Sequence, residues 1–160
     1  MPEFKFSYQT FAHSNELQPE LEQLLKLAKS NTENAYAPYS AFHVSAAVLL
    51  DNGEIVKGVN IENASYPVGI CAERSALSSV ISSFPNQGIK AIAISYASIH
   101  TESNKPTFPC GMCRQFISEC EDRNQKNILL ILAGQTGDII VIDSAKDLLP
   151  FSFGGKDLKI

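Results

Sequence analysis

The placement of cysteines constrains this chain more than any other feature of its sequence. Two short runs carry three of the four cysteines, C-A-E at residues 71–73 and P-C-G-M-C at residues 109–113. Each run precedes a predicted amphipathic helix, and a predicted strand over residues 90–98 lies between the two helices. If the three cysteines act together, the fold must bring the starts of two helices to one place.

Apolar periodicity predicts strands and helices along the rest of the chain. Strands are predicted over residues 44–50, 54–59, 90–98, 127–134 and 138–143. Helices are predicted over about 17–33, from near Cys71, and after Pro109, with a last helical turn over 144–149. Because helices separate the strands after an opening hairpin at residues 51–53, we expect an α/β fold. Its layers would be α/β/α around a mixed sheet of about five strands.

One domain is expected to account for most of the chain. Residues 17–160 contain no repeat, low-complexity tract or obvious linker, so they predict a single domain. Residues 1–16 carry scattered aromatics without a period, and they predict an irregular N-terminal arm. The tail from Phe151 to the end is also predicted to be irregular.

Composition narrows the classes of function. The chain has 160 residues, is 44% hydrophobic and has a net charge of -4, which disfavours a nucleic-acid binder because such proteins usually carry a basic patch. No apolar run reaches the roughly 18 residues that a membrane span needs. The first residues also lack the apolar core of a signal peptide, so a cytoplasmic location is expected. In a reducing compartment, clustered cysteines are more often metal ligands or catalysts than disulfide partners.

The three clustered cysteines predict a catalytic zinc site. Cys71, Cys110 and Cys113 supply three ligands, and no other Cys or His lies at a ligand spacing. Structural zinc sites usually have four protein ligands, whereas catalytic sites leave one position for water. Zinc with three thiolates has a net charge of -1, which two helix N-termini would offset. Arg74 and Arg114 could also donate hydrogen bonds to the thiolates.

Glu73 lies two residues after a predicted ligand and in the first turn of its helix. A carboxylate in that position can take a proton from zinc-activated water and pass it on. The competing interpretation is a structural zinc site in which Glu73 only caps the helix. A redox pair of Cys110 and Cys113 is disfavoured because no thioredoxin-like βαβ unit surrounds it. Cys120 is expected to fill the core.

Three segments together resemble one known family. These are AYAPYSAFHV at 35–44, NIENASYPVGICAER at 60–74 and PCGMCRQ at 109–115. They resemble the zinc-dependent cytidine deaminases of the small, homotetrameric type that act on free nucleosides, from about residue 20 to about residue 158. The resemblance implies one zinc per subunit, with Glu73 as catalytic acid and base and active sites shared between subunits.

The resemblance also implies residues that bind the substrate. Asn60 and Glu62 match residues that hold the ribose hydroxyls, and Phe42 matches an aromatic that packs on the pyrimidine. Backbone groups around Ala72 would hold the edge of the base, and Phe153 resembles an aromatic that reaches a neighbouring subunit's site. Read from the residues alone, Asn60 and Glu62 are ordinary turn polars and Phe42 is a core residue.

The implied reaction is hydrolytic deamination of cytidine and deoxycytidine to uridine and deoxyuridine in pyrimidine salvage. Activated water would attack carbon 4 while Glu73 moves the protons. The alternatives are a nucleic-acid-editing deaminase, a deoxycytidylate deaminase, a deaminase of a modified cytosine drug such as blasticidin, and a zinc-stabilised binding module without turnover. The net charge of -4 disfavours the first, and Glu73 argues against the last.

Overall fold

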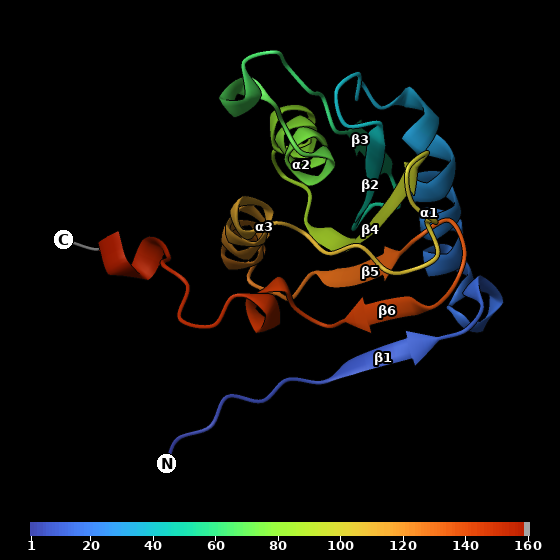
Figure 1. Ribbon diagram of the computed structural model, residues 1–160. Coiled ribbons are helices and arrows are strands. Elements are labelled where there is room, and N and C mark those ends of the chain that lie inside the picture. The colour runs from blue at the N-terminus through green and yellow to red at the C-terminus, as the bar shows by residue number, and fades with distance from the viewer. Residues whose placement is uncertain (159–160) are drawn as a thin grey trace.

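A single mixed sheet organises the chain in the computed structural model, which describes residues 1–158 (Figure 1). The strands are β1 (Tyr8–Phe11), β2 (Phe42–Leu50), β3 (Ile55–Val59), β4 (Ile89–Ser98), β5 (Leu129–Ala133) and β6 (Ile139–Ile142). Their order across the sheet is β1-β6-β5-β4-β2-β3. The β4–β5 pair is parallel and every other neighbouring pair is antiparallel.

Helices cover both faces of the sheet, so the three predicted layers are confirmed. Helix α1 (Pro19–Asn31) lies on one face, and α2 (Ala72–Ser83) and α3 (Gly111–Asn124) lie on the other (Figure 1). Alternate residues of each strand point to opposite faces. Ala47 and Leu49 therefore pack in the core under α1, whereas Ala46 and Val48 pack in the core under α2 and α3.

Local sequence explains where the helices begin. Helix α1 begins at Pro19 rather than at residue 17, because a proline fits the first turn of a helix, where its missing N–H costs no hydrogen bond. Helices α2 and α3 begin directly after Cys71 and Cys110, which are their N-cap residues. Helix α3 ends at Asn124, and its C-cap residue Gln125 adopts the left-handed conformation with φ 52°.

The sequence predicted an irregular N-terminal arm, but part of that arm forms a strand. Residues Tyr8–Phe11 form β1, which pairs with β6 from Tyr8 opposite Ile142 to Phe11 opposite Ile139. This strand raises the sheet from the expected five strands to six. The division into an arm and a domain at residue 17 stays a prediction, although β1 joins the arm to the sheet of the domain.

The chain after the last strand consists of short turns and irregular segments. It contains two short 3-10 turns, Ala145–Leu148 at the predicted last turn and Gly155–Leu158 within the tail predicted as irregular. Residues 159–160, which end that tail, lie outside the described residues. Among the helices of residues 1–158, none has the length and apolar character needed to cross a membrane.

Candidate metal centre and active site

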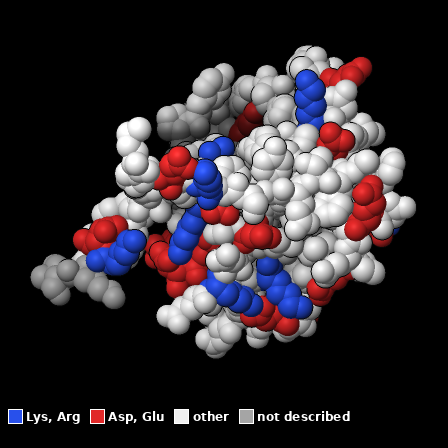
Figure 2. All heavy atoms as spheres, turned by 90° about the horizontal axis from the view of Figure 1, so that it is seen from below, with Lys and Arg blue, Asp and Glu red and all other residues white. Residues whose placement is uncertain are grey.

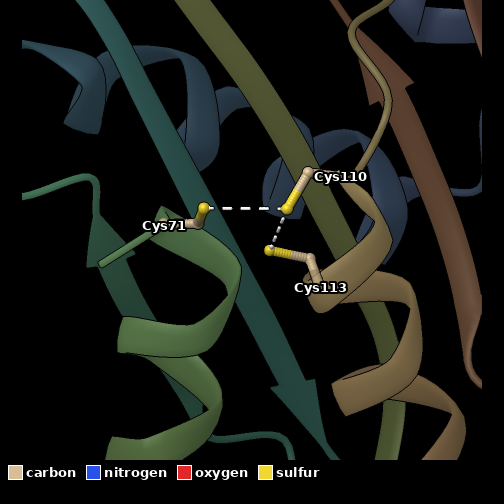
Figure 3. A group of neighbouring side chains, drawn as sticks. All are labelled: Cys71, Cys110 and Cys113. Carbon is tan, nitrogen blue, oxygen red and sulfur yellow. Dashed lines mark hydrogen bonds between the residues drawn. The ribbon is translucent and has the colours of Figure 1, made fainter. Parts of the chain in front are cut away.

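Two helix N-termini bring the three predicted zinc ligands together. Cys71 precedes α2, Cys110 precedes α3, and Cys113 lies in the first turn of α3 (Figure 3). The Sγ atom of Cys110 lies 3.9 Å from that of Cys71 and 3.5 Å from that of Cys113. All three sulfur atoms lie within 4.8 Å of one another.

This geometry fits a tetrahedral zinc ion. With Zn–S bonds of about 2.3 Å, tetrahedral angles put neighbouring sulfurs about 3.8 Å apart, close to the observed separations. Unpaired N–H groups at the two helix starts also favour the negative charge that the thiolates carry. Three protein ligands leave one coordination position open, as catalytic sites require.

The thiols share protons in a way that favours a thiolate. A hydrogen bond from the Cys113 side chain lowers the pKa of Cys71 to about 5, with contributions from Cys110 and Arg74. The same contact with Cys71 raises the pKa of Cys113 above its usual value, and burial adds to the effect. Because the ligand is the thiolate, zinc binding must release the protons that the cluster shares.

Glu73 is a buried carboxylate beside this cluster. Its side chain is 4% exposed, and burial raises its pKa above the usual value for a carboxyl group. Its position in the first turn of α2, two residues after Cys71, places it on the same cavity as the sulfurs. Its role as a proton carrier stays a prediction.

A cavity of about 630 Å³ opens onto the cluster. Phe42, Asn60, Glu62 and Ala72, all predicted to bind substrate, line this cavity together with Cys71, Cys110 and Glu73. The sequence did not single out several other lining residues, which are Tyr39, Tyr66, Thr107, Phe108 and Met112. Of these, Phe108 directly precedes the second cysteine run and Met112 lies within it, so their closeness to Cys110 along the chain was the available signal.

Asn60 also holds the backbone of β2. Its Oδ1 accepts a hydrogen bond of 2.7 Å from the Val44 N–H, and its Nδ2 donates one of 2.9 Å to the Phe42 carbonyl. The residue therefore braces the backbone of β2 locally, and it lines the cavity as well. Its role toward a sugar stays a prediction.

Glu62 braces the loop that contains Tyr39 and Ser40, which also line the cavity. Its Oε2 accepts hydrogen bonds from the Tyr39 N–H at 2.9 Å and the Ser40 N–H at 3.2 Å, and its Oε1 accepts from the Ser40 hydroxyl. The Ser40 hydrogen bond is the main reason that the pKa of Glu62 is lowered. The cavity thus carries an ionised carboxylate at this edge.

The two arginines have different surroundings. Arg74 lowers the pKa of the Cys71 thiol and donates a hydrogen bond of 3.3 Å to the Gly69 carbonyl. Arg114 donates to the carbonyls of Pro109, at 2.8 Å, and Leu148, at 3.0 Å. It therefore ties the chain just before Cys110 to the C-terminal segment, and its expected bond to a thiolate stays a prediction.

Phe153 does not line the cavity of its own chain. Its side chain is 58% exposed, and its carbonyl accepts a hydrogen bond of 2.8 Å from Gln115 Nε2. The expectation that it reaches the site of a neighbouring subunit therefore stays a prediction.

Gly58 allows α2 to lie directly against the sheet. A Cβ atom at this position would stand 2.3 Å from the Ala76 nitrogen and 2.7 Å from the Ala72 carbonyl oxygen. Both contacts are to the backbone of α2, in the turn that follows Cys71 and contains Glu73. The missing side chain at Gly58 therefore sets how close the helix that carries these two residues comes to β3.

Replacing Gly58 by Ala should displace the first turn of α2 by about 1 Å, because nonbonded carbon atoms need about 3.5 Å. We expect the free energy of unfolding to fall by about 1–3 kcal/mol. Turnover per folded molecule should fall about 100-fold, since a shift of that size disturbs the site. Urea unfolding and steady-state kinetics measure the two effects. Gly155→Ala is the matched control because its Cβ would meet no atom within 4 Å. Equal behaviour of the two variants would contradict this role of Gly58.

Comparisons with known proteins agree with this site. A family model described as the cytidine and deoxycytidylate deaminase zinc-binding region matches residues 18–127, which include both cysteine runs. A cytidine deaminase of Halalkalibacterium halodurans is 38% identical over 137 residues, covering 86% of this chain and 96% of the relative.

Comparison with solved structures identifies proteins of the same family. The crystal structure of a cytidine deaminase from Burkholderia pseudomallei has a TM-score of 0.71 at 38% identity, covering 82% of this chain and 97% of the other. That of Mycobacterium tuberculosis has a TM-score of 0.65 at 29% identity, covering 86% and 99%. The match extends over nearly the whole length of these proteins, so the fold and the metal site are those of one structural family.

Proposed function

Because this chain belongs to the cytidine and deoxycytidylate deaminase family, with its zinc-binding region, we propose that it hydrolyses cytidine and deoxycytidine to uridine and deoxyuridine. Each turnover would consume one water and release one ammonia. The observation that carries the proposal is the cluster of Cys71, Cys110 and Cys113 beside a cavity that Cys71, Cys110 and Glu73 line. Phe42, Asn60 and Glu62, which we propose bind the nucleoside, also line that cavity.

The residues of the chain divide the chemistry between them. Zinc, when bound by the three cysteines, would act as a Lewis acid that lowers the pKa of water toward neutrality. Glu73 takes a proton from the attacking water and delivers it to ring nitrogen 3. It then carries a second proton from the new hydroxyl on carbon 4 to the 4-amino group, so that the C4=O bond forms as the C4–N bond breaks and ammonia leaves. Backbone groups at Ala72 hold the edge of the base, Phe42 packs on its face, and Asn60 and Glu62 bind the sugar.

Charge favours a nucleoside over a phosphorylated or polymeric substrate. The lowered pKa of Glu62 keeps a negative charge in the cavity, which opposes a 5′-phosphate placed near it. Figure 2 shows Lys and Arg groups interspersed with Asp and Glu on the face seen from below, without a field of one sign. That face offers no basic stripe for a nucleic-acid backbone.

The fall in ultraviolet absorbance on deamination tests the proposed reaction. Purified protein is given cytidine, deoxycytidine, deoxycytidylate, blasticidin S and a cytosine-containing oligonucleotide in separate assays. We expect the first two to be turned over with the highest kcat/KM. A higher kcat/KM for any of the other three compounds would identify that compound as the preferred substrate and overturn the proposal. If none of the five were turned over, the zinc-stabilised binding module without turnover would become the favoured interpretation.

Sugar recognition predicts a strong preference for the nucleoside over the free base. Cytosine cannot make the hydrogen bonds that the sugar hydroxyls would add to Asn60 and Glu62, each worth about 1–3 kcal/mol. We expect kcat/KM for cytosine to be at least about 30-fold below that for cytidine. Glu62→Ala should lower kcat/KM for cytidine and so reduce the ratio of kcat/KM for cytidine to that for cytosine. The control Glu54→Ala, at an exposed position after the hairpin turn, should change neither value. A wild-type protein that turns over both substrates equally well would contradict the prediction.

We further propose a homotetramer with shared sites, in the cytoplasm, serving pyrimidine salvage. Exposed Phe151 and Phe153 in the tail favour a subunit contact, since aromatic rings are enriched in interface cores. The free thiols, which must stay reduced to bind zinc, favour the cytoplasm.

The shared site gives its own prediction. Light scattering coupled to gel filtration should find four chains rather than one of 17.5 kDa. Phe153→Ala should raise the KM for cytidine while zinc content stays at one per chain, because the ring would cap a neighbour's cavity without contacting the metal. A fully active monomer would contradict both the assembly and the shared site.

A further inference from the structure

The ring of Phe42 rests on a second aromatic ring that does not reach the cavity. The centroids of Phe42 and Tyr96 lie 4.7 Å apart, and the two ring planes differ by 19°, so the rings are stacked. Phe42 lines the cavity whereas Tyr96 does not, and Tyr96 is only 8% exposed. Tyr96 therefore supports Phe42 from the protein side.

The sheet and a side-chain hydrogen bond hold Tyr96 in place. It stands on β4 opposite Val44 of β2, two residues along from Phe42, and therefore on the same face of the sheet. Its hydroxyl donates a hydrogen bond of 3.3 Å to the Glu102 carbonyl, and its own carbonyl accepts one of 3.1 Å from Gln135 Nε2. With its backbone and its hydroxyl both anchored, the Tyr96 ring has little freedom to turn.

We propose that Tyr96 is a positioning residue that fixes the plane of Phe42 and thereby sets the depth of the subsite for the cytosine base. This inference rests on the proposed function of the cavity. A ring that is already ordered before binding loses little conformational freedom when the base stacks on it, so affinity is higher. Without Tyr96, Phe42 could tilt into the space left behind, and the base would lose its flat support.

The position of Tyr96 predicts an effect on binding alone. Tyr96 is absent from the residues that line the cavity, whereas Glu73, Cys71 and Cys110 line it. Tyr96→Leu should raise the KM for cytidine about 5–20-fold. The inhibition constant for uridine should rise in parallel, while kcat and the zinc content stay within about twofold of the wild type. Tyr96→Phe keeps the ring and should restore KM to within about threefold of the wild-type value.

Kinetics on four proteins test the inference: the wild type, Tyr96→Leu, Phe42→Leu and the double variant. If Tyr96 acts through Phe42, its replacement should have almost no further effect on KM once Phe42 is gone. Additive effects of the two changes would overturn the inference, as would an unchanged KM in Tyr96→Leu or a kcat that falls as far as KM rises. If Tyr96→Leu does not fold, Tyr96→Met, which fills more of the space, takes its place under the same criteria.

The two proposals fail in different ways. A wild-type protein that turns over no cytosine nucleoside would overturn the proposed function and this inference with it. An active wild-type protein whose KM does not respond to Tyr96 would overturn only the inference.

Discussion

Replacing Glu73 by Gln is expected to lower kcat for cytidine by at least about 100-fold while the protein keeps its zinc and its fold. Gln has the size of Glu but cannot take up and release a proton. General acid–base catalysis typically contributes about 10²–10⁴-fold to a rate. The expected loss lies in that range because one carboxylate is proposed to serve more than one proton transfer.

The structure explains why no neighbouring group should replace Glu73. It is the acidic residue in the first turn of α2, it is almost fully buried, and it lines the cavity beside the sulfurs. Glu62 lines the same cavity, but its oxygens already accept hydrogen bonds from Tyr39 and Ser40. A proton carrier must lie within hydrogen-bonding reach of the group that it serves.

Glu121→Gln provides the matched control, because Glu121 is also a buried carboxylate on a helix, in its case α3. Its Oε1 accepts from the Ile128 and Ala145 N–H groups, and its Oε2 accepts from the Ser144 hydroxyl. This variant should lower the free energy of unfolding by about 1–3 kcal/mol and leave kcat per folded molecule within about twofold. Steady-state kinetics and zinc analysis of both variants make the comparison. A loss below tenfold in Glu73→Gln would show that Glu73 is not the proton carrier.

Much of the metal site could be predicted because its determinants are local. The spacing of Cys71 to Glu73 and of Cys110 to Cys113 fixes which side chains share a helix start. The structure has both helices beginning directly after Cys71 and Cys110. The apolar runs likewise predicted five of the six strands, since a buried strand needs such a run whatever its neighbours are.

The features that the sequence did not reveal depend on contacts between distant residues. Strand β1 forms because β6 offers a free edge, and nothing in residues 8–11 alone specifies that partner. The role of Gly58 follows from the approach of α2, and a glycine within a strand has several possible reasons. Tyr96 lies 54 positions after Phe42 in the chain, and only the pairing of β2 with β4 brings their rings together.

Removing the Cys110 thiol should abolish zinc binding and with it all turnover. Its sulfur lies within 3.9 Å of both other ligands, so Cys110→Ala leaves only Cys71 and Cys113. Cys110 is exposed, which means that the truncation leaves no cavity in the core. We expect metal analysis to find about one zinc per chain in the wild type and less than about one-tenth in the variant. A chelator should lower the melting temperature of the wild type, because a bound metal stabilises only the folded chain. The same chelator should not change the melting temperature of Cys110→Ala.

Cys120→Ala separates the loss of a ligand from the loss of a cysteine. Cys120 lies on the same helix, but it packs in the core under α2 and α3. Burial raises the pKa of its thiol to about 11, so it stays protonated and is a poor ligand. This variant should keep one zinc per chain and full turnover per folded molecule, with a lower melting temperature that still responds to a chelator. If Cys110→Ala retained as much zinc as Cys120→Ala, the metal would have to be held elsewhere, and the open coordination position beside Glu73 would lose its basis.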